Sequence, residues 1–150
     1  MKFATALAVA AVTAATFGAT AVIGQQDPVT TRENLMKENN DHARTLVRMM
    51  RGQRPFDAAA VETAFAQWAD TAKRLPGLFP EDSKAGGDTR ASPTIWLDKD
   101  DFDARAAAFG KAVTENRDKA KASLDGLKAA VTAVGKQCDH CHEDYRLSKR

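Results

Sequence analysis

Two cysteines and a histidine near the C-terminus form the pattern with the clearest chemical meaning. Cys138 and Cys141 are the only cysteines of this 150-residue chain, and His142 follows the second one directly. Residues three apart lie on one face of a helix, so both thiols can add to the two vinyl groups at one edge of a porphyrin. His142 can then turn a ring nitrogen toward the iron. The C-x-x-C-H spacing therefore predicts one covalently attached haem c.

Other interpretations of the motif stay open at this point. A disulfide of thioredoxin type between Cys138 and Cys141 is possible, but that motif usually follows a strand and opens a helix. A zinc site would recruit His140 as well, although no second ligand pair at metal-binding spacing occurs elsewhere in the chain. A chance match is the remaining alternative. The position of both cysteines on a core-facing stripe favours haem.

That stripe predicts the helix that carries the motif. Apolar side chains and the two cysteines recur at alternating spacings of three and four, at Leu124, Leu127, Val131, Val134, Cys138, Cys141 and Tyr145. This rhythm is typical of a helix that packs in a bundle. Ser123 can cap its start. Both cysteines are therefore expected on the buried face.

Caps and breakers delimit three earlier helices. They are expected from Asp27-Pro28 to Gly52, from Asp57 to Pro76-Gly77, and from the acidic cluster at 98–101 to about Lys121. The connection from 76 to 97 is long enough to have a function or to hide short helical turns. Ala-rich stretches and only 7% aromatic residues also favour helices over sheets. The sequence predicts an all-α fold, an antiparallel four-helix bundle with a C-terminal covalent haem c.

The core-facing stripe of the first helix is interrupted by polar residues. It is predicted to run through Val29, Arg32, Met36, Asn39, Ala43, Leu46 and Met50. Arg32 and Asn39 lie where a simple bundle would have apolar side chains. Something polar or metallic is therefore expected to interrupt the core at that level.

Residues 1–24 are predicted to be a signal peptide, followed by one domain at 25–150. Lys2 is the only charge before Asp27, and residues 3–15 are almost all apolar. Small residues allow cleavage after Ala21 or Gly24, and we favour Gly24. A retained membrane anchor is the alternative, although the stretch is weakly hydrophobic. We expect a soluble periplasmic protein with no stable membrane association after cleavage.

Size and charge exclude several classes of function. A chain of 150 residues has room for one modest domain, not for a multidomain enzyme. The net charge of +2, from 22 basic and 20 acidic residues, is too small to hold a nucleic-acid backbone. Redox partner proteins are the expected partners. The sequence does not distinguish a monomer from a homodimer.

The chain resembles the class II c-type cytochromes, the family that includes cytochrome c prime. The resemblance covers the mature chain and rests first on Cys138-Asp-His-Cys141-His142-Glu-Asp-Tyr145-Arg146 near the C-terminus. Weaker matches are Gly52-x-x-Pro55-Phe56-Asp57, Leu75-Pro76-x-Leu78-Phe79-Pro80 and Pro93-x-Ile95-Trp96. The resemblance implies thioethers at both cysteines, His142 as the proximal axial ligand, and a long loop over the haem edge. The segment 35–40 looks most like the low-spin, Met-ligated branch.

Met36 is the candidate for the second axial ligand. In an up-and-down bundle the start of the first helix is level with the end of the last, which places Met36 level with His142. Met50 lies about 21 Å further along the helix, Met49 points away by more than about 120°, and His42 is expected at a bundle edge. A buried methionine usually only fills core space. The resemblance nevertheless places Met36 at the distal position, where the low-spin branch has a ligating methionine.

Arginines and aromatic residues complete the candidate site. Arg32 and Arg146 could simply be solvated helix charges, as most arginines are. By resemblance, Arg32 pairs with a haem propionate, and Arg146 provides the base beside the proximal imidazole of His142. Trp96 and Phe79 are expected to pack around the haem and the loop.

Coordination then decides the expected function. An iron with two protein ligands has no open position for a substrate, and the chain offers no other set of acid, base or nucleophile. We therefore expect a monohaem electron carrier and not an enzyme. The alternative is a five-coordinate cytochrome that binds nitric oxide or carbon monoxide. A third possibility, a structural or redox-thiol module without haem, requires the C-x-x-C-H interpretation to be wrong.

Overall fold

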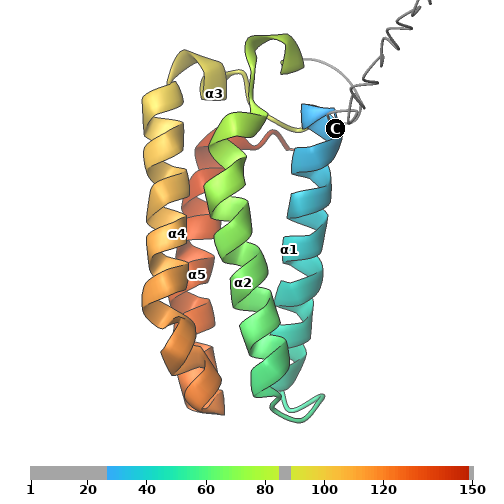
Figure 1. Cartoon of the computed structure of the whole chain (residues 1–150), viewed down its shortest axis with the longest axis vertical. Helices are drawn as coiled ribbons and strands as arrows, with labels where there is room; N and C mark the ends of the chain where they lie inside the picture. Colours follow the sequence, from blue (N-terminus) through green and yellow to red (C-terminus); the bar gives the residue numbers. More distant parts are fainter. Residues whose placement is uncertain (1–26, 85–88, 149–150) are drawn as a thin grey trace, which may run out of the picture.

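The computed structural model describes residues 27–84 and 89–148. Figure 1 shows four long helices that run alternately up and down, namely α1 (Pro28–Met50), α2 (Ala58–Arg74), α4 (Lys99–Ala122) and α5 (Leu124–Tyr145). The predicted all-α antiparallel four-helix bundle is confirmed. The predicted signal peptide at 1–24 lies outside the described residues. Within the described ranges, no helix is long and apolar enough to cross a membrane.

Each long helix begins at a side chain that caps its free N–H groups. The carboxylates of Asp27, Asp57 and Asp98 and the hydroxyl of Ser123 all accept hydrogen bonds from backbone N–H groups in the first turn of the helix that follows. At the other end of α1, Gly52 has a φ of +69°, a left-handed conformation that costs glycine little. The chain can therefore reverse sharply between α1 and α2.

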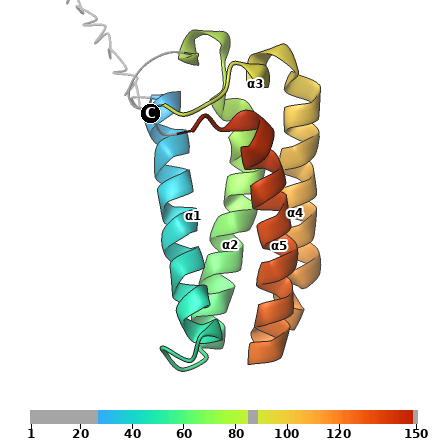
Figure 2. The same ribbon diagram turned by 180° about the vertical axis from the view of Figure 1, so that it is seen from behind.

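The described part of the long connection between α2 and α4, which leaves out residues 85–88, contains three short helical pieces. These are the 3₁₀ turns η1 (Leu75–Leu78) and η2 (Glu81–Ser83) and the short helix α3 (Thr94–Leu97). Figure 1 places this connection at one end of the bundle. Figure 2, the reverse view, shows the start of α1 and the end of α5 at that same end. The expected alignment of these two helix ends is therefore confirmed.

The apolar core is divided into two clusters along the bundle. The cluster at the far end contains Leu46, Met49, Val61, Ala64, Phe65, Trp68, Val113, Ala120, Leu127, Ala130 and Val134. The cluster nearer the long connection contains Leu75, Phe79, Ile95, Phe102 and Tyr145. Cys138 packs against the first cluster, whereas Met36 and Cys141 pack against the second. The predicted motif and its candidate partner thus lie where the two clusters meet.

The stripe predicted for the first helix is confirmed only in part at its C-terminal end, because Met50 packs against the core but is not the most buried residue there. Met49 is fully buried, whereas Met50 is only half-buried. At about 100° per residue, Leu35, Leu46 and Met49 fall within about 60° of one another and form the most buried face of α1. Met36 lies on the neighbouring stripe. The sequence pattern did not separate these two faces because both carry apolar residues.

Candidate haem site

A cavity of about 580 Å³ lies between α1 and α5, a size within the range of known cofactor pockets. Residues from α1, α2, η1, the loop at 89–91, α3, α4 and α5 line it. Six predicted site residues lie on its wall: Arg32, Met36, Cys138, Cys141, His142 and Arg146. Side chains 102–114 residues apart in sequence, such as Met36 and Cys138 or Arg32 and Arg146, are therefore brought to one site.

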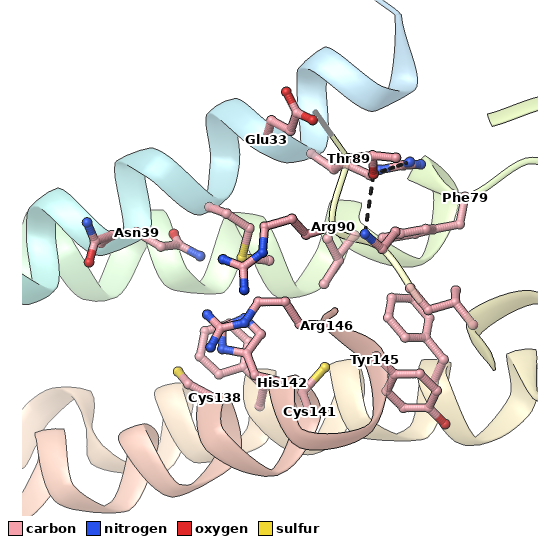
Figure 3. Close-up of a pocket in the computed structure, with 18 of the residues that line it drawn as sticks. Glu33, Asn39, Phe79, Thr89, Arg90, Cys138, Cys141, His142, Tyr145 and Arg146 are labelled. Atoms are coloured by element: carbon pink, nitrogen blue, oxygen red, sulfur yellow. Dashed lines mark hydrogen bonds between the residues drawn. The ribbon is translucent and has the colours of Figure 1, made fainter. Parts of the chain in front are cut away.

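The two cysteines form part of the α5 wall. Figure 3 shows the sulfur atoms of Cys138 and Cys141 pointing from α5 into the cavity. Both thiols are free and half-buried. Burial raises the pKa of Cys138 to about 11 and also raises the pKa of Cys141. Two neutral thiols on one wall fit the attachment of a porphyrin edge.

His142 lies beside the cysteines on the same wall (Figure 3). Burial lowers the pKa of His142, and the positive charge of Arg146 lowers it further. Both effects favour the neutral imidazole, which is the form that can donate a ring nitrogen to a metal. Within the described residues, no group of three or more His, Cys, Asp or Glu side chains gathers as a metal site. The zinc alternative thus gains no support from the part of the chain that is described.

Met36 provides a thioether from α1. It is half-buried and lines the same cavity as His142, which comes from α5. Much of the remaining wall is apolar, with Leu75, Phe79, Ile95, Phe102 and Phe109. A thioether, an imidazole and two thiols around an apolar cavity are a donor set that fits haem c. The side chains that line the cavity therefore fit a haem c group.

Arg32 is buried among hydrogen-bond acceptors of the long connection. Nη1 donates to the carbonyl of Leu78 and to Oγ of Ser83, each at 3.0 Å. Nη2 donates to the carbonyl of Ser83 at 2.9 Å and to Oγ1 of Thr89 at 3.0 Å. Its guanidinium also lies 4.6 Å from the centre of the Phe79 ring. Arg32 therefore links the connection to α1. Among the described residues, Nε is the one N–H group of its guanidinium without a hydrogen-bond partner, and it could serve the predicted propionate pairing.

Trp96 lies one layer behind the cavity wall. Its ring meets that of Phe79 edge to face, with centroids 5.6 Å apart, and Nε1 donates to the carbonyl of Pro80 at 3.1 Å. Phe79 lines the cavity, whereas Trp96 is not among the lining residues described. The expected packing around the loop is present. Trp96 supports Phe79 from behind, and its contact with the cofactor stays a prediction.

Arg90, which the sequence did not predict as a site residue, lies with Arg146 at the cavity (Figure 3). The segment before α3 pairs with the end of α5 through an antiparallel bridge between Ala91 and Arg146. The guanidinium of Arg90 donates to the carbonyl of Leu147 at 2.6–2.9 Å. These contacts hold two positive side chains near His142. Arg90 lies in a loop without helical periodicity, so no sequence pattern indicated that it belongs to the site.

Arg105 on α4 was also missed, although it contacts the motif directly. Nη2 pairs with Asp144 at 3.0 Å, and Nε pairs with Asp101 at 3.0 Å. The hydroxyl of Tyr145 donates to the same Asp101 carboxylate at 2.6 Å. Only the spacing of Asp101 and Arg105, four apart on one helix, could have indicated part of this network. His140 is exposed and His42 is half-buried, as expected for residues outside the cavity.

Comparisons with known proteins agree with this geometry. The family model described as cytochrome c' matches residues 27–146. A cytochrome c-556 from Rhodopseudomonas palustris is 41% identical over 132 residues, covering 85% of this chain and 88% of the relative. A cytochrome c' from the same organism is 38% identical over 127 residues, covering 85% and 86%. The solved structure of a Rhodopseudomonas palustris cytochrome c' superposes with a TM-score of 0.78 at 37% identity, covering 84% of this chain and all of that one.

Proposed function

The chain belongs to the cytochrome c' family, whose members carry one covalent haem c, and from this premise we propose that it is an electron carrier with iron held between His142 and Met36. The resemblance to class II c-type cytochromes and the haem c cofactor are thereby confirmed. The observation that carries the proposal is that Met36 on α1 and His142 on α5 line one cavity. In this proposal the protein would supply both ligands of the iron, one from α1 and one from α5.

Each group of residues has a defined role in the proposal. Cys138 and Cys141 would anchor the haem through thioethers, and His142 would provide an imidazole ligand for the iron. When bound, the haem supplies an iron that exchanges one electron. Phe79 and the apolar wall exclude water and support the flat ring. Arg146 lies close enough to lower the pKa of His142, so it is proposed to act on the proximal imidazole electrostatically.

The cellular setting is part of the same proposal. We propose export by residues 1–24, periplasmic localisation, and exchange of electrons with redox partner proteins. An iron with two protein ligands would have no open position for a substrate, and the sequence offers no second set of catalytic residues. The proposed role therefore includes no enzymatic turnover. Arg32 supports the cavity wall through the long connection, and Trp96 does so through Phe79.

A second candidate is a five-coordinate cytochrome that binds nitric oxide or carbon monoxide. Its support is that the cytochrome c' relative is nearly as similar as the cytochrome c-556 relative, at 38% against 41% identity. In that case Met36 would fill space on the distal side without bonding to the iron. Ligation by Met36 is the point on which the two candidates differ.

Optical spectroscopy of the exported, haem-loaded protein tests the proposal. We expect low-spin ferric features and a far-red sulfur-to-iron charge-transfer band in the wild type, both lost in Met36→Ala. Met50→Ala is the matched control, because Met50 lies far along α1 from the cavity, and its spectrum should keep the band. High-spin features unchanged by Met36→Ala would assign the five-coordinate alternative.

Carbon monoxide gives a second, kinetic test. A bound thioether must leave before carbon monoxide can bind, so binding to the reduced wild type should be slow and should accelerate in Met36→Ala. Rapid, tight binding to the wild type that is no faster in Met36→Ala would contradict an electron carrier.

A further inference from the structure

We propose that Asn39 is a hydrogen-bond donor on the distal side of the site and that its amide raises the reduction potential of the haem iron. This inference rests on the proposed function, since it needs haem in the cavity. Asn39 lies three residues after Met36 on α1, and both residues line the cavity. Positions three apart on a helix are neighbours on one face. An amide is thus placed beside the proposed axial ligand.

The orientation of the amide follows from its contact with α2. Oγ1 of Thr71 donates to Oδ1 of Asn39 at 2.9 Å, and Thr71 is fully buried. The amide oxygen therefore points toward Thr71 on α2, and Nδ2 points away from Thr71. Nδ2 has no hydrogen-bond partner among residues 27–84 and 89–148. It is not among buried atoms that lack a partner, so its surface is accessible. A donor that lines a cavity and lacks a protein partner is available to a group in that cavity.

The backbone of Asn39 also contacts α2. Nε1 of Trp68 donates to the carbonyl of Asn39 at 3.3 Å, so α2 contacts both the main chain and the amide of this residue. Asparagine is also unfavourable at a core-facing helix position unless its polar atoms are satisfied. Two contacts from α2 satisfy the oxygen atoms of Asn39, and a partner in the cavity would satisfy its free N–H groups. This accounts for a polar residue on this stripe.

The amide N–H of Asn39 is expected to raise the reduction potential for two reasons. A hydrogen bond from Nδ2 to the sulfur of Met36 withdraws electron density from that ligand. The positive end of the amide dipole also disfavours the ferric state, which carries one more positive charge than the ferrous state. Both effects stabilise the reduced protein. Hydrogen bonding around an axial ligand is one of the means by which a protein adjusts a haem potential.

Redox titration of the haem-loaded full chain tests the inference. Asn39→Leu keeps the side-chain size and removes the donor, so its reduction potential should fall below that of the wild type. Thr71→Val keeps the amide of Asn39 but removes the hydrogen bond that orients it. We expect a smaller fall in the reduction potential for this variant. Asn116→Leu is the matched control, because Nδ2 of Asn116 donates within α4 to the carbonyl of Ala112 at 2.8 Å. Its potential should equal that of the wild type.

Infrared spectroscopy with carbon monoxide as the probe gives a readout that a change in packing would not mimic. In the Met36→Ala background, an N–H donor near the bound carbon monoxide lowers the C–O stretching frequency. Adding Asn39→Leu should therefore raise that frequency, whereas adding Asn116→Leu should leave it in place. If the wild type itself binds carbon monoxide rapidly, the same comparison is made without Met36→Ala.

The outcomes separate this inference from the proposed function. Loss of the far-red band in Met36→Ala together with an unchanged potential and C–O stretch in Asn39→Leu overturns the role of Asn39 alone. Absence of the band in the wild type overturns Met36 ligation, while a shifted C–O stretch on replacing Asn39 still supports the donor.

Discussion

Nη1 of Arg105 donates to the main-chain carbonyl of His140 at 3.0 Å, and this bond joins α4 to the residue between the two cysteines of the motif. The same guanidinium pairs with Asp101 on its own helix and with Asp144 on α5. Arg105 is thus a positioning residue for the end of α5. These contacts hold the part of α5 that carries the cysteines and His142 against α4.

Replacing Arg105 is predicted to loosen the motif without removing any proposed ligand. We expect Arg105→Ala to lower the thermal midpoint of the apoprotein by a few degrees and to reduce the fraction of chains that attach haem. Arg105→Lys should recover part of both effects, since one cation remains. Pyridine haemochrome assays and circular dichroism measure the two quantities. The exposed Arg44→Ala serves as a control, and equal values for all four proteins would contradict the positioning role.

Arg32 is predicted to stabilise the long connection. Arg32→Met keeps an apolar stem but leaves the carbonyls of Leu78 and Ser83 without their donors. Loss of hydrogen bonds from a buried charged group should lower the free energy of unfolding by about 2–4 kcal/mol. Urea denaturation measures this value. A loss no larger than that of the exposed Arg51→Met would show that Arg32 is not a structural anchor.

Two glycines of α5 are predicted to respond in opposite directions to alanine. A Cβ at Gly126 would lie 2.1 Å from the main-chain oxygen of Lys119, so Gly126→Ala must displace backbone at the α4–α5 corner. We expect a loss of about 2–3 kcal/mol in unfolding free energy. A Cβ at Gly135 would meet nothing within 4 Å, so Gly135→Ala should stabilise the helix by about 0.5–1 kcal/mol. Equal effects of the two substitutions in urea denaturation would contradict the close approach of Gly126 to the backbone of Lys119.

The features that the sequence predicted correctly are set by short-range chemistry. The caps at Asp27, Asp57 and Ser123 act on N–H groups two to three residues away, so their sequence positions suffice to begin each helix. The motif fixes its own geometry in the same way, because Cys138 and Cys141 share a helix face.

The features that the sequence did not predict depend on which helix lies beside which. Thr71 orients Asn39 from another helix, and Arg105 reaches His140 across 35 residues. Arg90 enters the site from an aperiodic loop that pairs with the end of α5. The depth of Met49 likewise depends on the direction from which α2 and α5 approach α1. Such contacts become visible only once the bundle is assembled.

An ion cluster between α2 and α4 predicts how stability changes with pH. Glu62 on α2 accepts hydrogen bonds from Arg117 and pairs with Lys121 at 3.0 Å, both from α4. These partners hold the pKa of Glu62 down to about 2, against an ordinary value of 4.5. The folded chain therefore resists protonation that the unfolded chain accepts. The stabilisation is fully present above about pH 4.5 and is lost as the pH falls toward about 2.

The variant Glu62→Gln tests this dependence, because glutamine keeps the side-chain shape but cannot ionise. The difference in unfolding free energy between the wild type and Glu62→Gln should be constant from pH 7 to about pH 5 and should shrink as the pH is lowered further. Urea denaturation at stepped pH values measures it. In an Arg117→Gln/Lys121→Gln background the same substitution should show little pH dependence. A difference that stays constant down to pH 3 in the wild-type background would mean that the cluster does not lower the pKa of Glu62.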